Sequence, residues 1–132
     1  MNIGEAARRS GVSAKMIRHY ESIDLIPRVL RTEAGYRVYT EDGIHTLRFI
    51  RRARDLGFPI DRIRILLALW QDRERSNADV RRVAMDHVTE LKQRIGQMQA
   101  MAATLEHLAH CCAEHGDRPS CPILDNLGND QA

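Results

Sequence analysis

The stretch GVSAKMIRHYE, residues 11–21, decides the fold of the N-terminal part of the chain. The segment before it, residues 3–10, is predicted to be a short helix that ends at Gly11, a residue type that commonly follows a helix C-terminus. Ser13 is a good N-cap for a second helix that runs to about Glu21. A helix, a glycine turn and a second helix in this order predict a helix-turn-helix.

The residues that follow extend this motif into a winged domain. The segment 27–39 combines turn residues, a short alternating stretch and interspersed arginines, which predicts a small β-hairpin with a basic edge. Thr40 is the expected cap of a third helix that ends at Gly57. Pro59 then begins a fourth helix that continues to about Trp70, and we expect the indole of Trp70 to lie in the core.

A single long helix is predicted next, over residues 77–110, because this stretch of 34 residues contains no proline and one glycine. Its apolar positions alternate in steps of four and three: Ala84, Val88, Leu91, Ile95, Met98, Ala102, Leu105 and Ala109. Such a heptad seam indicates pairing with the same helix of a second subunit. We therefore expect a homodimer, with three parts in each chain: a DNA-binding domain at 1–75, a dimerisation helix at 76–110 and a C-terminal loop and tail helix at 111–132.

Composition excludes several classes of protein. The 132 residues are 43% hydrophobic and 29% charged, and no apolar run approaches the length of a membrane span. The N-terminus lacks the apolar segment of a secretory signal, so we expect a cytoplasmic protein. The sequence has no phosphate-binding loop, no paired acids at a defined spacing and no nucleophile with an evident base. Nothing in it therefore indicates an enzyme. Charge is uneven: residues 1–75 have a net charge of +5 and residues 76–132 a net charge of −3.

The second predicted helix has side chains suited to reading DNA. A helix-turn-helix places this helix in the major groove, with its N-terminal residues at base edges and nearby donors on phosphates. Lys15 and Met16 project early in the helix, and Arg18 and Tyr20 offer phosphate donors one turn later. The alternative for Tyr20 is packing between the hairpin and the helices, because tyrosine can do both.

The order and spacing of several segments resemble the winged helix-turn-helix of the MerR family. They are Ile3-Gly4-Glu5-Ala6-Ala7, Gly11-Val12-Ser13, Ile17-Arg18-His19-Tyr20-Glu21, Leu25-Ile26-Pro27, Gly35-Tyr36-Arg37-Val38-Tyr39 and residues 47–58. The resemblance implies a mainly α fold: a winged helix-turn-helix, a long antiparallel coiled-coil dimerisation helix and a short C-terminal metal-binding loop and helix. It also implies a dimeric regulator that binds a palindromic promoter and, on sensing its signal, distorts the DNA so that RNA polymerase can engage.

Carried over position by position, the resemblance assigns DNA-contacting roles. Lys15 and Met16 fall where the family approaches bases; Arg18, Tyr20, Tyr36 and Arg37 fall at backbone-contacting positions; Arg54 adds a phosphate contact. Packing is the alternative for Tyr36 as well as for Tyr20. The remaining arginines of the third helix, Arg48, Arg51 and Arg52, are interpreted as a solvated face.

Three cysteines lie close together near the C-terminus, at Cys111, Cys112 and Cys121. Cys112 and Cys121 flank an eight-residue loop, a spacing that lets two sulfurs converge. Thiolates are soft ligands that select Cu(I) and related ions, and two ligands leave Zn(II), which prefers four, unsatisfied. The residues alone thus indicate a site for a monovalent soft metal.

The segment Cys112-x8-Cys121-Pro122-Ile123-Leu124 is similar to the metal loop of the copper-responsive, CueR-like branch of the family, in which two cysteines bind Cu(I), Ag(I) or Au(I). Copper sensors typically have seven residues between the cysteines, and the eight found here are closer to the zinc-responsive branch. Residues 76–79 lack the third cysteine of divalent-metal members, which favours a monovalent ion.

Other readings of the cysteine cluster stay open. Cys111 and His115 are possible additional ligands, which would suit a divalent metal, and a disulfide between Cys112 and Cys121 would make a redox switch. A metal-buffering protein without site-specific affinity for DNA is a further alternative.

Overall fold

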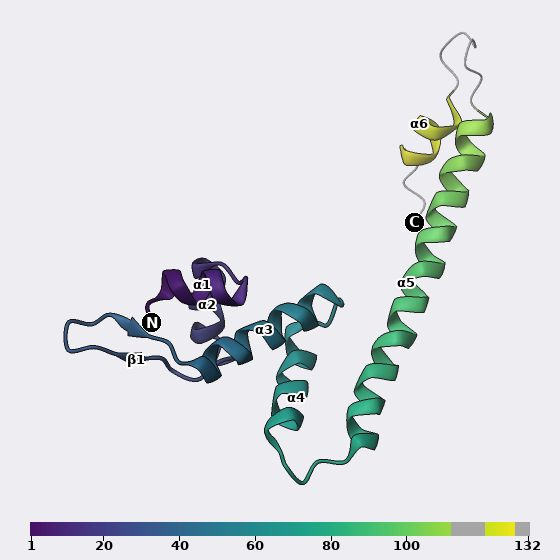
Figure 1. Ribbon diagram of the computed structural model, residues 1–132. Coiled ribbons are helices and arrows are strands. Elements are labelled where there is room, and N and C mark those ends of the chain that lie inside the picture. Colours follow the sequence, from purple (N-terminus) through teal and green to yellow (C-terminus); the bar gives the residue numbers. More distant parts are fainter. Residues whose placement is uncertain (112–120, 129–132) are drawn as a thin grey trace. The chain divides into compact units, whose positions relative to one another are not determined.

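The computed structural model describes residues 1–111 and 121–128 (Figure 1). The chain divides into two compact units, Met1–Val83 and Ala84–Ala132. The fold is mainly helical, as predicted. The elements are α1 (Ile3–Ser10), α2 (Ala14–Ser22), β1 (Leu30–Arg31), β2 (Arg37–Val38), α3 (Glu41–Asp55), α4 (Ile60–Gln71), α5 (Asn77–Cys111) and α6 (Pro122–Leu127). Helix α5 begins in the first unit and continues into the second.

Local capping explains where α1 and α2 begin and end. The Asn2 side chain accepts a hydrogen bond from the backbone N–H of Glu5 at 2.9 Å, and the Ser13 hydroxyl accepts one from Met16 at 3.2 Å. Gly11 ends α1 with φ of 75°, and the side chain of Arg51 occupies the space that a Cβ at this position would need. The predicted helix-turn-helix is therefore confirmed, and its glycine is favoured by the left-handed backbone conformation at this position.

The wing is an antiparallel pair of two-residue strands in which Leu30 pairs with Val38 and Arg31 with Arg37. At its tip, the backbone N–H of Tyr36 donates to the Thr32 hydroxyl at 3.1 Å. At its base, the N–H of Tyr39 donates to the carbonyl of Met1 at 2.8 Å, and the N-terminal amine donates to the Tyr39 carbonyl at 3.0 Å. The chain terminus thus fastens the wing to the helical part of the unit.

The core of the first unit is built around α3. Ile44, Leu47 and Ile50 are buried along one face of this helix, with Ile17 of α2 and Ile63 of α4 also fully buried. Their spacing of three residues on α3 is that of an amphipathic helix. Burying a side chain of this size stabilises the fold by roughly 1.5–3 kcal/mol relative to leaving it exposed.

Trp70 does not lie in the core, so that prediction was wrong. Its side chain is 44% exposed and stacks on Phe49 with ring centroids 4.6 Å apart. Ile63 and Leu67 of the same helix are buried, whereas Trp70 belongs to the last turn before α4 ends at Gln71. That turn reaches the edge of the core, where Phe49 covers one face of the indole.

Helix α5 is one residue longer than predicted and leaves most of its heptad seam exposed in the single chain. Ile95, Met98 and Leu105 are 54%, 65% and 53% exposed, which is unusual for large apolar side chains in a regular stripe. In the second unit, the short helix α6 lies beside the C-terminal part of α5 (Figure 1), and Leu127 of α6 shares a groove with Leu108. Within the described ranges, no helix is both long and apolar enough to cross a membrane.

Candidate nucleic-acid interface and metal site

Helix α2 presents an exposed cationic face, and Tyr20 is not part of it. Lys15 and Arg18 are exposed, whereas Met16 is half-buried and packs against the core. Tyr20 is 4% exposed, so the alternative of packing describes its ring. A contact from Tyr20 to the DNA backbone would have to come from its hydroxyl alone and stays a prediction, as do the base contacts of Lys15 and Met16.

An ion pair joins the wing to α2. The Nε of Arg37 donates to Oε2 of Glu21 at 3.0 Å, and the two side chains are 26% and 13% exposed. The partial burial makes this pair less screened by water than an ordinary surface pair. Arg37 therefore holds the wing against the helix, and the DNA-backbone contact that the family resemblance implies for it stays a prediction.

Arg18 lies between two hollows that the wing and α2 form. One, of about 400 Å³, is lined by Arg18, Glu21, Ser22, Asp24, Arg28 and Arg37. The other, of about 190 Å³, is lined by Asn2, Ile3, Arg18, Gly35, Tyr36 and Arg37. The structure thus brings Arg18, Tyr36 and Arg37 together, with Tyr36 73% exposed. Lys15 and Arg54 are exposed but line neither hollow.

Two arginines of this surface, Arg28 and Arg64, were not among the DNA-contacting residues predicted from the sequence. Arg28 shares the larger hollow with Arg18, and its only signal in the sequence was its place among the wing arginines. Arg64 of α4 donates to the carbonyl oxygens of Ile23 and Asp24 at 2.9 and 3.0 Å, at the C-terminal end of α2. Its partner carbonyls lie about 40 residues away in the chain, so no local pattern could have indicated this role.

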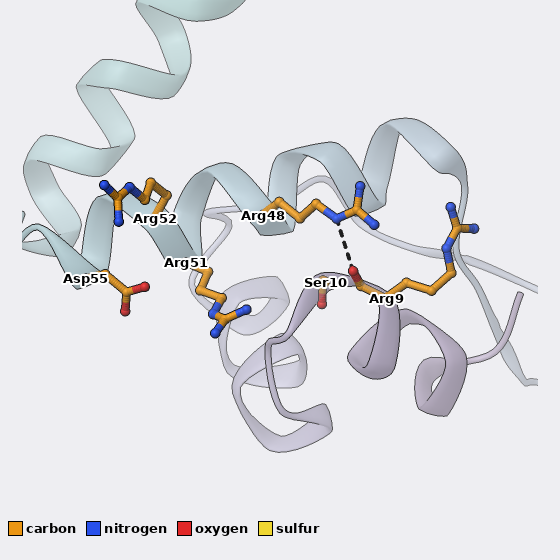
Figure 2. Close-up of a pocket in the computed structure, with 6 residues that line it drawn as sticks. All are labelled: Arg9, Ser10, Arg48, Arg51, Arg52 and Asp55. Carbon is orange, nitrogen blue, oxygen red and sulfur yellow. Dashed lines mark hydrogen bonds between the residues drawn. The ribbon is translucent and has the colours of Figure 1, made fainter.

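Three of the four arginines of α3 line a third hollow, shown in Figure 2, between α3 and the end of α1. Its lining residues are Arg9, Ser10, Arg48, Arg51, Arg52 and Asp55. Arg48, Arg51 and Arg52 are exposed, in keeping with a solvated face, but they share a concave surface. The Nε of Arg48 donates to the carbonyl of Arg9 at 3.0 Å, which caps the C-terminal end of α1.

Two acidic side chains of this unit, those of Glu41 and Tyr39, have shifted pKa values. The guanidinium of Arg9 forms two hydrogen bonds with Glu41, at 2.5 and 2.7 Å, and these hold the pKa of the Glu41 carboxyl below its ordinary value. Burial raises the pKa of the Tyr39 hydroxyl, which has no hydrogen-bond partner within the described part of the chain. Neither group faces the hollows around Arg18, so their shifts belong to the fold.

The metal-binding residues are only partly within the described ranges. Cys121 is the N-cap residue of α6 and is half-buried, and Pro122 occupies the first position of that helix as predicted. Cys111 ends α5, is exposed, and has its Sγ 3.9 Å from Nε2 of His107. Cys112 and His115 lie outside the described residues. Among those described, no group of three or more potential metal ligands comes together.

The described part of this donor set suits a soft metal ion. The thiols of Cys111 and Cys121 and the imidazole of His107 are sulfur and nitrogen ligands, without the carboxylate oxygens that hard cations prefer. Cys121 is half-buried, and its side chain makes no capping hydrogen bond to α6. The residues therefore fit an ion that binds through sulfur.

Comparison with known proteins gives a consistent result. The family description "MerR HTH family regulatory protein" matches residues 1–70, and "MerR, DNA binding" matches residues 44–108. The chain is 56% identical to heavy metal-dependent transcription regulator 2 of Rhizobium meliloti, covering 100% of this chain and 89% of that protein. It is 38% identical to the transcriptional regulator CueR of Salmonella typhimurium, covering 96% of this chain and 91% of the relative.

Among solved structures, the chain is similar to the transcription regulator PbrR691 of Ralstonia metallidurans in complex with lead(II). The TM-score is 0.85 at 30% sequence identity, over 97% of this chain and 99% of that one. The two family matches together span both the helix-turn-helix and most of α5. The chain belongs to the MerR family of helix-turn-helix, DNA-binding transcription regulators, and it is not an enzyme.

Proposed function

We propose that this protein is a heavy-metal-responsive transcription regulator whose inducing ion is Cu(I), with Ag(I) and Au(I) as related ligands, bound by Cys112 and Cys121. The observation that carries the proposal is the place of Cys121, half-buried at the start of a helix that lies on α5. Relatives support it: one is a heavy metal-dependent regulator and another is CueR. A bound ion would supply charge neutralisation and a cross-link between the two sulfurs.

The protein acts as a homodimer on a palindromic promoter, where it activates transcription by distorting the DNA so that RNA polymerase can engage. The exposed seam of α5 supports the dimer, because pairing would remove its large apolar side chains from water. A two-fold symmetric protein holds two recognition helices at a fixed separation and therefore matches a palindromic site.

The sensing step depends on packing between α6 and α5. Leu127 of α6 and Leu105 and Leu108 of α5 line a shared groove of about 410 Å³ in the described structure. Cys121 is joined directly to the first turn of α6, so constraining its sulfur changes where this helix can lie. A bound metal ion can shift the protein from its resting to its activating state only if it interacts more favourably with the activating state. A change in the packing of α6 on α5 would provide that difference.

A divalent soft metal is the second candidate. PbrR691 is described in complex with lead(II), and in this chain His107 places an imidazole nitrogen 3.9 Å from the sulfur of Cys111. If Cys111 or His115 joined Cys112 and Cys121, the site would have three or more ligands, which divalent ions require more often than Cu(I) does.

The deciding experiment compares three serine variants in metal-dependent transcription from a promoter that the wild type binds. Cys112→Ser and Cys121→Ser should each abolish the response to Cu(I) while operator affinity stays close to that of the wild type. Cys111→Ser is the matched control, since it removes a neighbouring thiol and should leave the Cu(I) response intact.

Metal titration followed by absorption spectroscopy completes the test. We expect one Cu(I) per subunit at a two-sulfur site and weak Zn(II) binding. A Cys111→Ser variant that loses its response, together with tight Zn(II) or Pb(II) binding by the wild type, would replace the copper proposal with the divalent one. Operator binding that disappears in the cysteine variants would contradict the separation of sensing from DNA binding.

A further inference from the structure

The hollow between α1 and α3 is lined mainly by arginines. It measures about 220 Å³, and four of its lining residues are arginines, while Asp55 is the one lining carboxylate. Figure 2 shows that these arginines come from two elements, Arg9 from α1 and the others from α3. Like charges that line one hollow repel each other, although water and salt screen the repulsion between exposed groups, and a bound anion would relieve it.

The four arginines are not equivalent, because the fold uses two of them. Arg9 forms an ion pair with Glu41 through two hydrogen bonds, and the Nε of Arg48 donates a hydrogen bond to the carbonyl of Arg9. Within the described ranges, the side chains of Arg51 and Arg52 make no hydrogen bond or ion pair, although each is long enough to reach several acceptors. With Arg9 balanced by Glu41, the three α3 arginines that line the hollow face one carboxylate, which leaves a local excess of positive charge.

The position of Arg51 links this hollow to the helix-turn-helix. Its side chain lies over Gly11, at the turn between α1 and α2, where its guanidinium occupies the position that a Cβ would take. Ser10, which also lines the hollow, is 2% exposed, and its hydroxyl oxygen accepts a hydrogen bond from Val12. The hydroxyl hydrogen remains a donor. The next residues along the chain lead directly to Ser13, the N-cap of α2.

We propose that Arg51 and Arg52, assisted by Arg48, form a phosphate-binding site, and that its occupant is a backbone phosphate of the DNA that α2 reads. Guanidinium groups bind phosphate oxygens in a two-bond geometry, which a hollow lined by several of them favours. The site adjoins the N-terminal end of α2, where the bases are contacted, so its phosphate lies at the edge of the same half-site. The inference rests on DNA binding by this protein.

The experiment measures binding of the full-length protein to a promoter duplex that the wild type selects from a randomised library. Arg52→Gln should lower affinity by up to about fivefold at moderate salt and reduce the slope of log affinity against log salt by about 0.9. Arg51→Gln should do the same. Arg73→Gln is the matched control, because Arg73 is an exposed arginine in the loop after α4 and lines none of these hollows.

A second arm identifies the occupant. Single phosphates of the duplex are replaced by neutral methylphosphonates, and one such replacement in each half-site should weaken the wild type while having no further effect on Arg52→Gln. A thermal shift of the wild type in sodium phosphate, compared with sodium chloride of equal ionic strength, tests a free phosphate instead.

The possible results distinguish failure of the phosphate site from failure of its assignment to DNA. Unchanged salt slopes in both arginine variants, with no phosphate effect, overturn the site. A phosphate-dependent stabilisation that Arg52→Gln abolishes, without a change in salt slope, overturns the DNA assignment. Unchanged DNA binding with reduced transcription would instead assign the arginines to an acidic protein segment. A wild type that selects no duplex contradicts DNA binding itself and is thereby distinguished from failure of this site alone.

Discussion

Replacing Arg64 with methionine should loosen the C-terminal end of α2 and destabilise the first unit. The guanidinium of Arg64 donates to the carbonyls of Ile23 and Asp24 at 2.9 and 3.0 Å. Asp24 has φ of 58°, a left-handed conformation that costs a non-glycine residue about 1 kcal/mol or more. Methionine keeps most of the aliphatic stem, so the substitution removes the two hydrogen bonds and the charge.

The magnitude follows from the exposure of the site. A hydrogen bond to a charged group contributes about 1.5–3 kcal/mol when water is excluded, but Arg64 is exposed and water can replace it at the carbonyls. A cation at a helix C-terminus adds about 0.3–1 kcal/mol. We therefore expect a loss of about 1–2 kcal/mol, which corresponds to a fall in Tm of about 5–10 °C for a unit of this size.

The assay is urea unfolding at a fixed protein concentration, because the proposed dimer would make the apparent stability depend on concentration. Arg73→Met controls for the loss of one exposed positive charge. Arg64→Lys should restore little of the stability, since an ammonium group does not present two donors in a fixed plane. Equal midpoints for Arg64→Met and Arg73→Met would refute the capping role.

DNA binding separates this positioning role from a phosphate contact. Because Arg64 acts on the backbone of α2, Arg64→Met should weaken binding to the selected duplex while its salt slope stays that of the wild type. Arg52→Gln should change the slope. A slope reduced by about 0.9 in Arg64→Met would mean that Arg64 itself contacts the DNA.

Three further predictions concern other parts of the chain. Replacing Leu91 and Ile95 by glutamate should give monomers with lost operator affinity, and unchanged dimers in sedimentation would refute the α5 seam. Lys15→Ala should relax base preference at one position of each half-site; equal losses on specific and random duplexes would remove its base-reading role. Tyr39→Phe should leave stability near pH 7 unchanged or raise it by up to about 1 kcal/mol, since it removes an unpaired buried hydroxyl. Burial raises the pKa of the Tyr39 hydroxyl above its ordinary value of 10.0, so this hydroxyl ionises less readily in the folded state than in the unfolded state. The wild type should therefore lose stability as the pH rises above 10.0. The urea midpoint of Tyr39→Phe should fall less over the same pH range, because phenylalanine does not ionise.

Local chemistry made most of the helices predictable. Ser13 and Thr40 both accept hydrogen bonds from the third residue after them, at 3.2 and 3.1 Å, as N-caps do. Gly11 takes the left-handed conformation expected after a helix. These interactions span three or four residues, so the sequence contains all the information that determines them. The same holds for Pro122 at the start of α6.

Longer-range interactions were the ones that sequence reasoning missed. Trp70 continues an apolar stripe, but its burial depends on how far the core extends beneath the last turn of α4. The contact of Arg64 with the end of α2 and that of Arg48 with the end of α1 join an arginine to backbone carbonyls. Any residue can supply a carbonyl, so such contacts have no partner residue type to find in the sequence.

The same distinction changes how the positive charge of the first unit should be interpreted. Three arginines form hydrogen bonds within the first unit that connect one element to another. Arg37 connects the wing to α2, Arg48 connects α3 to α1, and Arg64 connects α4 to the end of α2. Net charge counts them equally with Arg18 and Arg51, which make no such bond within the described ranges. Arginines of the second kind retain their full hydrogen-bonding capacity for a phosphate, and those of the first kind set the angle at which α2 and the wing meet it. The salt dependence of DNA binding should therefore report the unengaged arginines, while the affinity for one particular site depends on both kinds.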